Sequence, residues 1–371
     1  MIAMTVAMGV SRFVYTPILP AMMEQLGLSA ADAGMIASAN YIGYLAGALL
    51  AAGGWAQGAE RGWMLAGIGL SAVFAFAMAA TDSLAAFLAL RFLAGVASAF
   101  LMVFLGAIVF SQLAAAGRPD LQWLHFGGVG AGIAITGATV GLSNAAGLGW
   151  QAGWLWAGAL NVAGFAAAWL MVDRGPAATG DAGREPPLPA TRAMRGLTLA
   201  YGLFGFGYIV TATFLVAIVR QGDAGQALEG WVWIATGLAG FPSVWLWNRL
   251  VMRIGLTETF ALACVVEAVG VTASVSMGGV AGPLIGGVLL GGTFIAITAF
   301  GLQAGRRLAG RSPRRALALM TAAFGLGQIL GPLAAGFAAD MTGSFLAPSM
   351  GAAAALVLAA AIALATARGK T

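Results

Sequence analysis

Residues 9–51 read GVSRFVYTPILPAMMEQLGLSAADAGMIASANYIGYLAGALLA. Two long apolar runs fill this stretch, with a short polar break after Glu24 and one basic residue, Arg12, inside the first run. A membrane-spanning helix needs roughly 20 apolar residues in succession. The stretch therefore predicts most of one spanning helix, over 2–23, and nearly all of a second, over 31–52.

The rest of the chain has the same character. Of its 371 residues, 60% are hydrophobic and only 8% are charged, and the mean hydropathy is +0.91. A soluble domain carries about 25% charged residues, so this chain must turn most of its surface to a lipid bilayer. We predict an all-α polytopic membrane protein with twelve spans, at 2–23, 31–52, 62–80, 84–111, 122–143, 150–172, 196–219, 230–251, 257–277, 280–304, 314–338 and 345–367.

The longest polar break, 173–195, is rich in Pro, Gly and charged residues and predicts a cytoplasmic linker. It divides the chain into an N-terminal six-helix bundle, 1–172, and a C-terminal six-helix bundle, 196–371. With both termini in the cytoplasm, 15 of the 18 Lys and Arg residues fall on the inner side, whereas Arg220 falls outside. Inner loops of membrane proteins carry such an excess, so the net charge of +5 reflects topology rather than nucleic-acid binding. Because the chain is rich in Ala, Gly and Arg, we expect a bacterial inner (plasma) membrane protein.

The two halves resemble each other at one offset. The first span reads GVSRFVYTPILP from Gly9 and the seventh reads GFGYIVTATFLV from Gly205, which is 196 residues later. The same offset pairs glycines of two further helices, Gly34 with Gly230 and Gly95 with Gly291. Parallel six-helix repeats imply a two-fold axis along the membrane normal, with a substrate site between the halves near the midplane.

Arg12 is the sharpest functional signal. It lies midway along the first span, where a charge costs about 2.5 to 3.5 kcal/mol on insertion scales. Helical spacing places it on one face with Thr5, Tyr15 and Thr16. A guanidinium suits carboxylates and similar anions, so we predict an anchor for an anionic substrate or a gating ion pair. The alternative is a structural arginine that bonds helix-end carbonyls or extends toward the membrane surface.

Three further groups are candidates for coupling or gating. Arg91 precedes Gly95 by one turn in the fourth span, and its alternative role is helix packing. Glu267 is the only carboxylate deep in a predicted span, which makes it the default proton carrier; the alternative is a neutral packing residue. His125 begins the fifth span and suits a proton relay, or it is a solvated residue at the inner boundary.

Polar residues of two other spans are candidate substrate contacts. Tyr208 and Thr211 of the seventh span are the mates of Arg12 and Tyr15 at the offset of 196. The second span adds Asn40 and Tyr41. Tyrosines of membrane helices also serve as interfacial anchors, which is the alternative for each tyrosine.

The sequence excludes several other classes of chemistry. With one Cys and one His, the chain has no intramolecular disulfide and no histidine-cluster metal site. It contains no Walker A, H-E-x-x-H or G-x-S-x-G motif, so neither ATP-driven transport nor these hydrolases are indicated. We expect no enzyme activity, no metal and no cofactor, and a monomer whose partners are a small-molecule solute, the lipid bilayer and protons.

The chain resembles the major facilitator superfamily (MFS), and more narrowly its YbfB/YjiJ-like branch. The quoted stretch from Gly9, LRFLAGVASAFLMV from Leu90 and LHFGGVGAGIAITG from Leu124 carry the resemblance. It implies that the arginine of the R-x-x-x-G motif, here Arg91, takes part in proton coupling. It also implies that helices 1, 4, 7 and 10 surround the cavity and that helices 3, 6, 9 and 12 lie outside it. That arrangement favours Arg12 and Arg91 and counts against Glu267.

Two departures from the family pattern bear on mechanism. The loop between the second and third spans, GGWAQGAERG, lacks the aspartate and most basic residues of the family motif, which puts the usual gating ion pair in doubt. The fifth span lacks the Gly-Pro of the antiporter motif.

From the predicted spans, the buried arginine and the resemblance together, we predict a secondary transporter that works by alternating access and moves a small organic, anionic solute with protons. An efflux pump for hydrophobic or aromatic compounds is the alternative, and a non-transporting membrane sensor or enzyme is a remote one.

Overall fold

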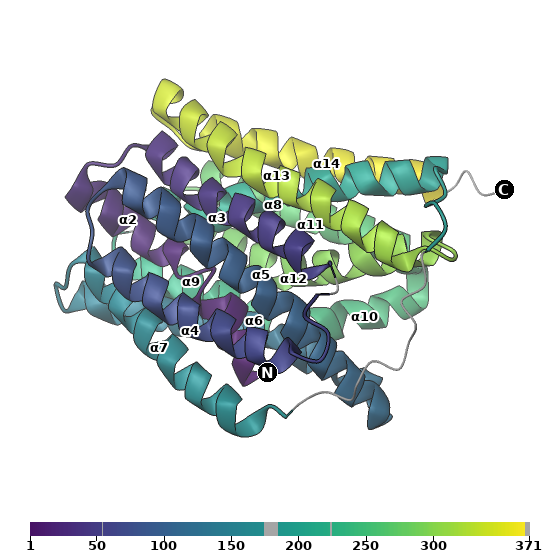
Figure 1. Cartoon of the computed structure of the whole chain (residues 1–371). Helices are drawn as coiled ribbons and strands as arrows, with labels where there is room; N and C mark the ends of the chain where they lie inside the picture. The colour runs from purple at the N-terminus through teal and green to yellow at the C-terminus, as the bar shows by residue number, and fades with distance from the viewer. Residues whose placement is uncertain (54, 174–184, 223–224, 368–371) are drawn as a thin grey trace.

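The computed structural model describes residues 1–53, 55–173, 185–222 and 225–367. Every regular element within these ranges is a helix, and the long helices run back and forth across a single bundle (Figure 1). The elements are α1 Ile2–Met4, η1 Thr5–Val10, α2 Tyr15–Leu26, α3 Ala30–Ala51, α4 Glu60–Ala79, α5 Leu84–Ala115, η2 Pro119–Leu121, α6 Gln122–Ala145, α7 Trp150–Met171, α8 Arg192–Gln221, α9 Ala227–Gly240, α10 Ser243–Ile254, α11 Leu256–Ser276, α12 Ala281–Leu308, α13 Pro313–Thr342 and α14 Leu346–Ala367.

Within the described residues, eleven helical segments are long and apolar enough to cross a membrane. The predicted span at 230–251 is the exception, because it is divided into α9 and α10 at Pro242. Proline has no backbone N–H to donate and interrupts a helix. The pair α9–α10 together covers Ala227–Ile254, and we count it as the eighth span, which brings the total to twelve.

The first span is continuous from Ile2 to Leu26 but is not uniformly α-helical. Its segment Thr5–Val10 is a π-helix, and an irregular turn follows over 11–14. The Ser11 amide accordingly bonds the Val6 carbonyl, five residues back, and the Ser11 hydroxyl lies 2.8 Å from Asn161 Oδ1 in α7. The α-helical spacing that placed Thr5 and Arg12 on one face therefore does not hold here. Such π-helical turns occur frequently at functional sites.

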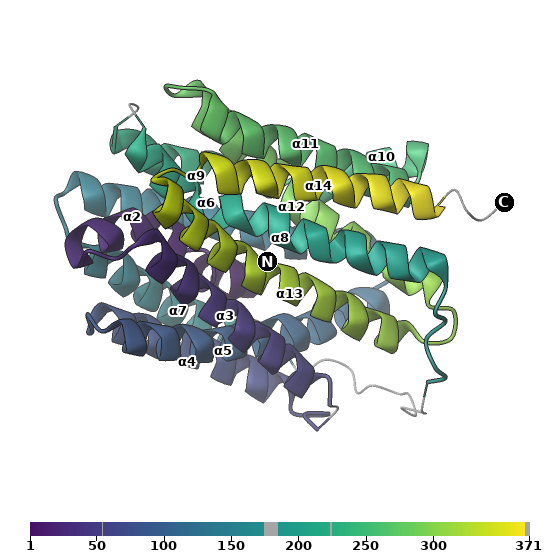
Figure 2. The same cartoon turned by 90° about the horizontal axis from the view of Figure 1, so that it is seen from above.

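Helix contacts repeat at the offset of 196. Gly95 of α5 packs so closely on the Asn40 carbonyl of α3 that no Cβ would fit there. Gly291 of α12 packs in the same way on the Thr236 carbonyl of α9. Because 40 and 236, like 95 and 291, differ by 196, the same packing joins α3 to α5 and α9 to α12. The fold thus consists of two pseudo-symmetric six-helix bundles, which occupy the lower and upper parts of the view from above (Figure 2).

The pseudo-two-fold axis passes between α2 and α8. Residues that are equivalent in the two halves can touch each other only near that axis. Thr16 donates to the Ala212 carbonyl at 2.6 Å, and Glu24 pairs with Arg220; each pair is separated by 196 residues. Residues 174–184 of the predicted linker, 173–195, lie outside the described residues, and its last residues, from Arg192, already belong to α8. The limits of the halves, 1–172 and 196–371, stay a prediction.

Candidate functional site

Arg12 follows the π-helical segment and lies inside the bundle with 4% of its surface exposed. Its guanidinium carbon is 4.3 Å from the Tyr44 ring centroid and 5.0 Å from that of Tyr41, both on α3. Phe13 lies further off, at 6.0 Å. Aromatic faces attract cations, so α3 holds the buried charge of the first span.

Two nitrogen donors of Arg12 form no hydrogen bond with the described residues. Its Nε and Nη2 atoms are buried, and the described residues provide neither a hydrogen-bond partner for them nor a carboxylate that forms an ion pair with Arg12. Buried polar groups are normally satisfied, because an unmade hydrogen bond costs about 1–3 kcal/mol. An anion that reached Arg12 would supply the missing acceptors.

Arg91 forms a separate cluster inside the N-terminal half. Its guanidinium lies 5.1 Å from the Tyr15 ring and 5.7 Å from the Trp154 ring, and only 1% of the residue is exposed. The Tyr15 hydroxyl donates to the Ala33 carbonyl at 3.0 Å. Tyr15 therefore covers Arg91 and does not face Arg12, so the predicted group of Arg12 and Tyr15 divides between two clusters.

Asn40 and Thr16 are both engaged in helix-to-helix contacts. Asn40 Nδ2 donates to the Arg91 carbonyl at 2.9 Å and thereby joins α3 to α5 beside Gly95, while its Oδ1 has no partner among the described residues. Thr16 bonds the Ala212 carbonyl at the axis. Both residues tie together elements that surround Arg12.

The C-terminal half presents a layer of stacked aromatic rings. Tyr208 lies nearly parallel to Phe294 of α12, with 5.8 Å between centroids, and to Phe324 of α13, with 5.6 Å. Gln328 donates to the Tyr208 hydroxyl. Thr211 is buried one turn further along α8, and its hydroxyl has no partner in the described part of the chain.

An aromatic contact joins this layer to the arginine. Phe13, the neighbour of Arg12, meets Phe294 edge to face, with centroids 5.6 Å apart and planes at 66°. Sequence reasoning found Arg12, Tyr41 and Tyr208 but missed Phe294. The available signal was its position in the tenth span, one of the four that the family resemblance places around the cavity.

Glu267 lies in α11 and is fully buried. Its Oε2 is 3.1 Å from the hydroxyl oxygen of Thr293 in α12, and that hydroxyl is also 2.6 Å from the Leu289 carbonyl. A hydroxyl has one hydrogen, and the shorter contact, to the carbonyl four residues back, takes it. A favourable contact with Glu267 then requires that the carboxyl group itself donates, which means that it is protonated.

His125 is packed near the start of α6, with 3% of its surface exposed. Its ring meets Phe110 and Phe126 edge to face, at centroid distances of 5.3 Å and 5.4 Å. Neither ring nitrogen has a partner within the described ranges. The expectation of a solvated boundary residue is wrong for this conformation, because aromatic rings cover the imidazole; a role in proton relay stays a prediction.

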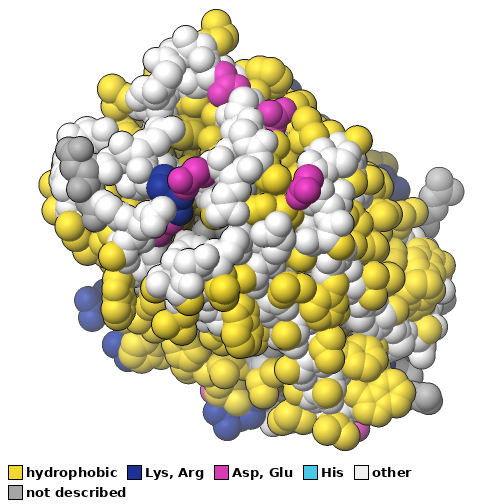
Figure 3. Space-filling model, turned by 90° about the vertical axis from the view of Figure 1, so that its left-hand side faces the viewer, with side chains coloured by type: hydrophobic (Ala, Val, Ile, Leu, Met, Phe, Trp, Pro, Cys, Tyr) yellow, Lys and Arg dark blue, Asp and Glu magenta, His cyan; other side chains and the backbone are white. Residues whose placement is uncertain are grey.

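Carboxylates tie the two halves together on the predicted outer side, which Figure 3 views face on. The Asp340 carboxylate at the end of α13 accepts from the backbone N–H groups of Ala30 and Ala31, both at 2.9 Å, at the start of α3. Nearby, Arg220 bonds both Glu24 and Glu229. The Asp340 and Glu24 contacts join the two halves at this end of the bundle, whereas Glu229 binds Arg220 within the C-terminal half.

On the predicted inner side, Glu185 takes a comparable position. Its two oxygens accept from the backbone N–H groups of Arg314 and Arg315 at 3.1 Å, at the start of α13. In the first turn of α4, Arg61 bonds the Val172 carbonyl just after α7 and therefore stays within its own half. The carboxylate that caps α13 thus comes from the predicted linker and not from the segment between α3 and α4.

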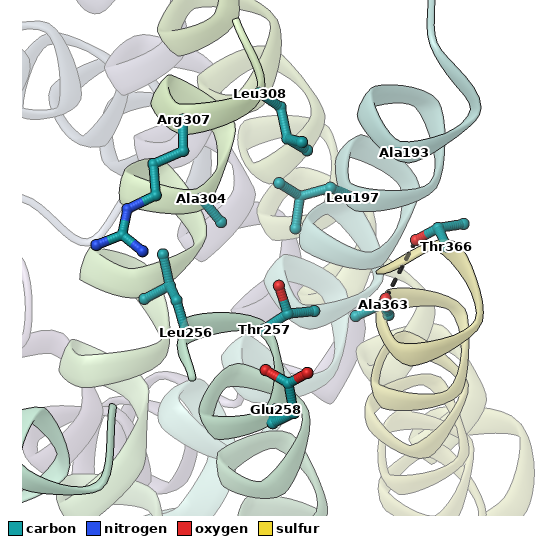
Figure 4. Close-up of a pocket in the computed structure, with 10 residues that line it drawn as sticks. All are labelled: Ala193, Leu197, Leu256, Thr257, Glu258, Ala304, Arg307, Leu308, Ala363 and Thr366. Carbon is teal, nitrogen blue, oxygen red and sulfur yellow. Dashed lines mark hydrogen bonds between the residues drawn. The ribbon is translucent and has the colours of Figure 1, made fainter. Parts of the chain in front are cut away.

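A pocket of about 210 Å³ opens between α8, α11, α12 and α14 near their predicted inner ends. Glu258 and Arg307 reach it from different helices, and neither bonds another of the lining residues drawn (Figure 4). None of the predicted site residues lines this pocket. The described residues also contain no group of three potential metal ligands.

Comparison with solved structures places the fold. The nucleoside transporter NupG, in a point-mutant form, superimposes with a TM-score of 0.78 at 14% identity, covering 98% of each chain. An auto-inhibited POT family peptide transporter gives a TM-score of 0.73 at 13% identity, covering 100% of this chain and 96% of the other. A bacterial homologue of the lysosomal transporter Spinster, inward-facing and occupied, gives 0.70 at 13% identity, covering 99% and 95%.

These likenesses show that the two pseudo-symmetric six-helix bundles have the fold shared by these solved transporters. Residues 4–364 match the family model described as "Uncharacterised MFS-type transporter YbfB", so the chain belongs to that family. Comparison with curated proteins found no match. The resemblance seen in the sequence is thereby confirmed.

Proposed function

We propose that this secondary transporter moves a small organic anion and that Arg12 is its anchor. The observation that carries the proposal is a buried guanidinium with two unpartnered donors, next to the interface between the halves. Binding an anion would satisfy these donors, and rocking of the halves about the contact between α2 and α8 would carry the anion across. The protein works as a monomer in a bacterial inner membrane, with both termini in the cytoplasm.

Transport in proteoliposomes tests the anchor. Arg12→Gln removes the charge and most of the donors, so anion uptake is expected to fall at least tenfold, given about 1.5–3 kcal/mol for each hydrogen bond to a charged group. Arg249→Gln is the matched control, because Arg249 also lies over an aromatic ring, 3.8 Å from the Trp245 centroid, but in α10. Unchanged anion transport in Arg12→Gln would refute the proposal.

We assign proton coupling to Glu267. Its contact with Thr293 is consistent with a protonated carboxyl group, and Thr293 immediately precedes Phe294 of the aromatic layer. Release of the proton would leave a buried charge without a partner, which is costly, and would therefore favour a different position of α12. Although α11 belongs to the outer helices, this side chain points toward α12.

Two transport assays with Glu267→Gln test the coupling proposal: substrate exchange and substrate accumulation. Glu267→Gln keeps a neutral hydrogen-bonding side chain, so exchange of labelled for unlabelled substrate is expected to continue. Accumulation driven by a pH gradient is expected to disappear. Glu258→Gln, an exposed carboxylate in the first turn of the same helix, is the control. Undiminished accumulation in Glu267→Gln would remove this residue from the coupling mechanism.

One observation supports the alternative, efflux of hydrophobic compounds. An apolar groove of about 530 Å³ opens between α8 and α13, lined chiefly by leucines and Phe206. A groove on the flank of the bundle would admit a compound from the bilayer. Export of a neutral aromatic dye that is lost in Leu203→Glu but retained in Arg12→Gln would favour this function over anion transport.

A further inference from the structure

The two unpartnered donors of Arg12 lie on one edge of its guanidinium. Nε–H and Nη2–H point in the same direction and together match the two oxygens of a carboxylate. Arg118 demonstrates this geometry in the same molecule, since its Nε and Nη2 bond the two oxygens of Asp120, each at 3.0 Å. Arg220 uses the same two atoms for the two oxygens of Glu229. The edge whose two buried donors have no partner in Arg12 is therefore one that binds a carboxylate elsewhere in this chain.

The surroundings of Arg12 limit how a ligand can approach. The rings of Tyr44 and Tyr41 cover the guanidinium at 4.3 Å and 5.0 Å. A ligand must then approach in the plane of the guanidinium, which is the geometry of a side-on carboxylate. The other buried arginine, Arg91, lies against Tyr15 and Trp154 and leaves only its Nε without a partner among the described residues, so it lacks the two-donor edge of Arg12. One such edge matches one carboxylate on the ligand.

Aromatic rings lie beside the Arg12 guanidinium. Phe13 adjoins Arg12 and meets the edge of Phe294, which stacks on Tyr208 at an interplanar angle of 6°. Phe324 extends the stack on the other side of Tyr208, at 7°. Parallel rings favour another flat ring over a puckered or branched group of similar volume.

We propose that the substrate is a monocarboxylate carried on a flat aromatic ring. Its carboxylate binds side-on to Nε and Nη2 of Arg12, and its ring packs against Phe13 and the stack of Phe294 and Tyr208. This inference rests on the proposed function and specifies its substrate class. The proposed function and the proposed substrate class can fail separately.

Binding to the purified full-length protein tests the class with defined probes. We expect benzoate to raise the melting temperature and to bind about tenfold more tightly than cyclohexanecarboxylate, which has the same charge and a puckered ring; a tenfold difference corresponds to about 1.4 kcal/mol. Benzamide, which is flat but neutral, is expected not to bind. Arg12→Lys should weaken benzoate binding roughly tenfold or more, because an ammonium cannot reproduce the two parallel bonds.

A second variant isolates the ring contact. Phe294→Leu keeps an apolar side chain, so it should weaken benzoate but leave cyclohexanecarboxylate nearly unchanged. Arg249→Lys is the control for loss of a guanidinium. Equal affinities for the two acids, with equal effects of Phe294→Leu, would overturn the aromatic assignment and leave anion transport standing. Binding of benzenesulfonate but of neither carboxylate would overturn the carboxylate assignment alone. If no organic anion binds, the proposed function itself fails.

Discussion

Asp340 offers the sharpest test of how the outer side opens. Its two carboxylate oxygens accept from the N–H groups of Ala30 and Ala31 at 2.9 Å, and these contacts join the end of α13 to the start of α3 in the other half. Asn in its place has one acceptor oxygen and turns an NH₂ group toward the second N–H. The variant Asp340→Asn therefore loses one charge-assisted bond and the favourable charge at a helix N-terminus.

The size of the effect follows from these losses. A hydrogen bond to a charged group contributes about 1.5–3 kcal/mol and a charge at a helix end about 0.3–1 kcal/mol. Water recovers part of both in the open state, so we expect a net effect of about 2 kcal/mol, which is roughly a 30-fold rise in the ratio of outer-open to outer-closed protein. Asp32→Asn is the matched control, because Asp32 caps the same helix but bonds Ser29 of its own half.

Cysteine labelling measures that ratio. Ala212 lies at the axis with 4% of its surface exposed, behind the outer contacts. In a Cys264→Ser, Ala212→Cys background, a membrane-impermeant maleimide added from outside should react about 30-fold faster when Asp340→Asn is present. Asp32→Asn should leave the rate near that of the background. Equal rates in all three proteins would refute the claim that Asp340 holds the outer side closed.

Two further predictions concern packing and the inner side. Gly291→Ala should lower the melting temperature, because the added Cβ would meet the Thr236 carbonyl and overpacking costs about 1–3 kcal/mol. The control is Gly292→Ala, which should leave the melting temperature unchanged because a Cβ at Gly292 has open space around it. Partial burial raises the pKa of Glu185, but the N–H groups of Arg314 and Arg315 outweigh it and hold that pKa below its ordinary value. A lowered pKa means that the ionised contact is complete above the unfolded-state pKa and is lost as the pH falls through the folded-state pKa. The protection factors for amide exchange at the start of α13 should therefore fall at acidic pH, and they should already be low at neutral pH in Glu185→Gln.

The fold followed from hydrophobicity, but its irregular parts did not. Long apolar runs located the spans, because the bilayer leaves few other structures open to them. The break in the span at 230–251 was indicated by Pro242, but the long apolar run around it favoured a single continuous helix. The π-helical segment before Arg12 had none, because it accompanies a contact between Ser11 and Asn161 of α7, far apart in the chain.

The site was only partly predictable for a related reason. A charged residue inside an apolar run is conspicuous in the sequence, and this is how Arg12, Arg91 and Glu267 were found. The aromatic residues around them are not conspicuous, because 20 Phe and 11 Trp are distributed over the chain and most simply pack or face lipid. Which way a side chain points depends on the rotation of its helix, and a helix that is apolar all round carries no periodic signal of that rotation. Glu267 is the example, since the family arrangement places its helix outside while its side chain reaches α12.

The positions of the capping carboxylates bear on the transport cycle. Asp340 joins α13 to α3 across the interface between the halves, whereas Glu185 reaches α13 from the part of the predicted linker that precedes α8. The outer side therefore has a direct bond between the halves that must break before it opens. At the inner end of α13, the capping carboxylate leads into α8 of the same half, and Arg61 binds within the other half. Opening of the inner side requires neither of these contacts to break, so the inner side is the one that should open more easily when a ligand leaves Arg12.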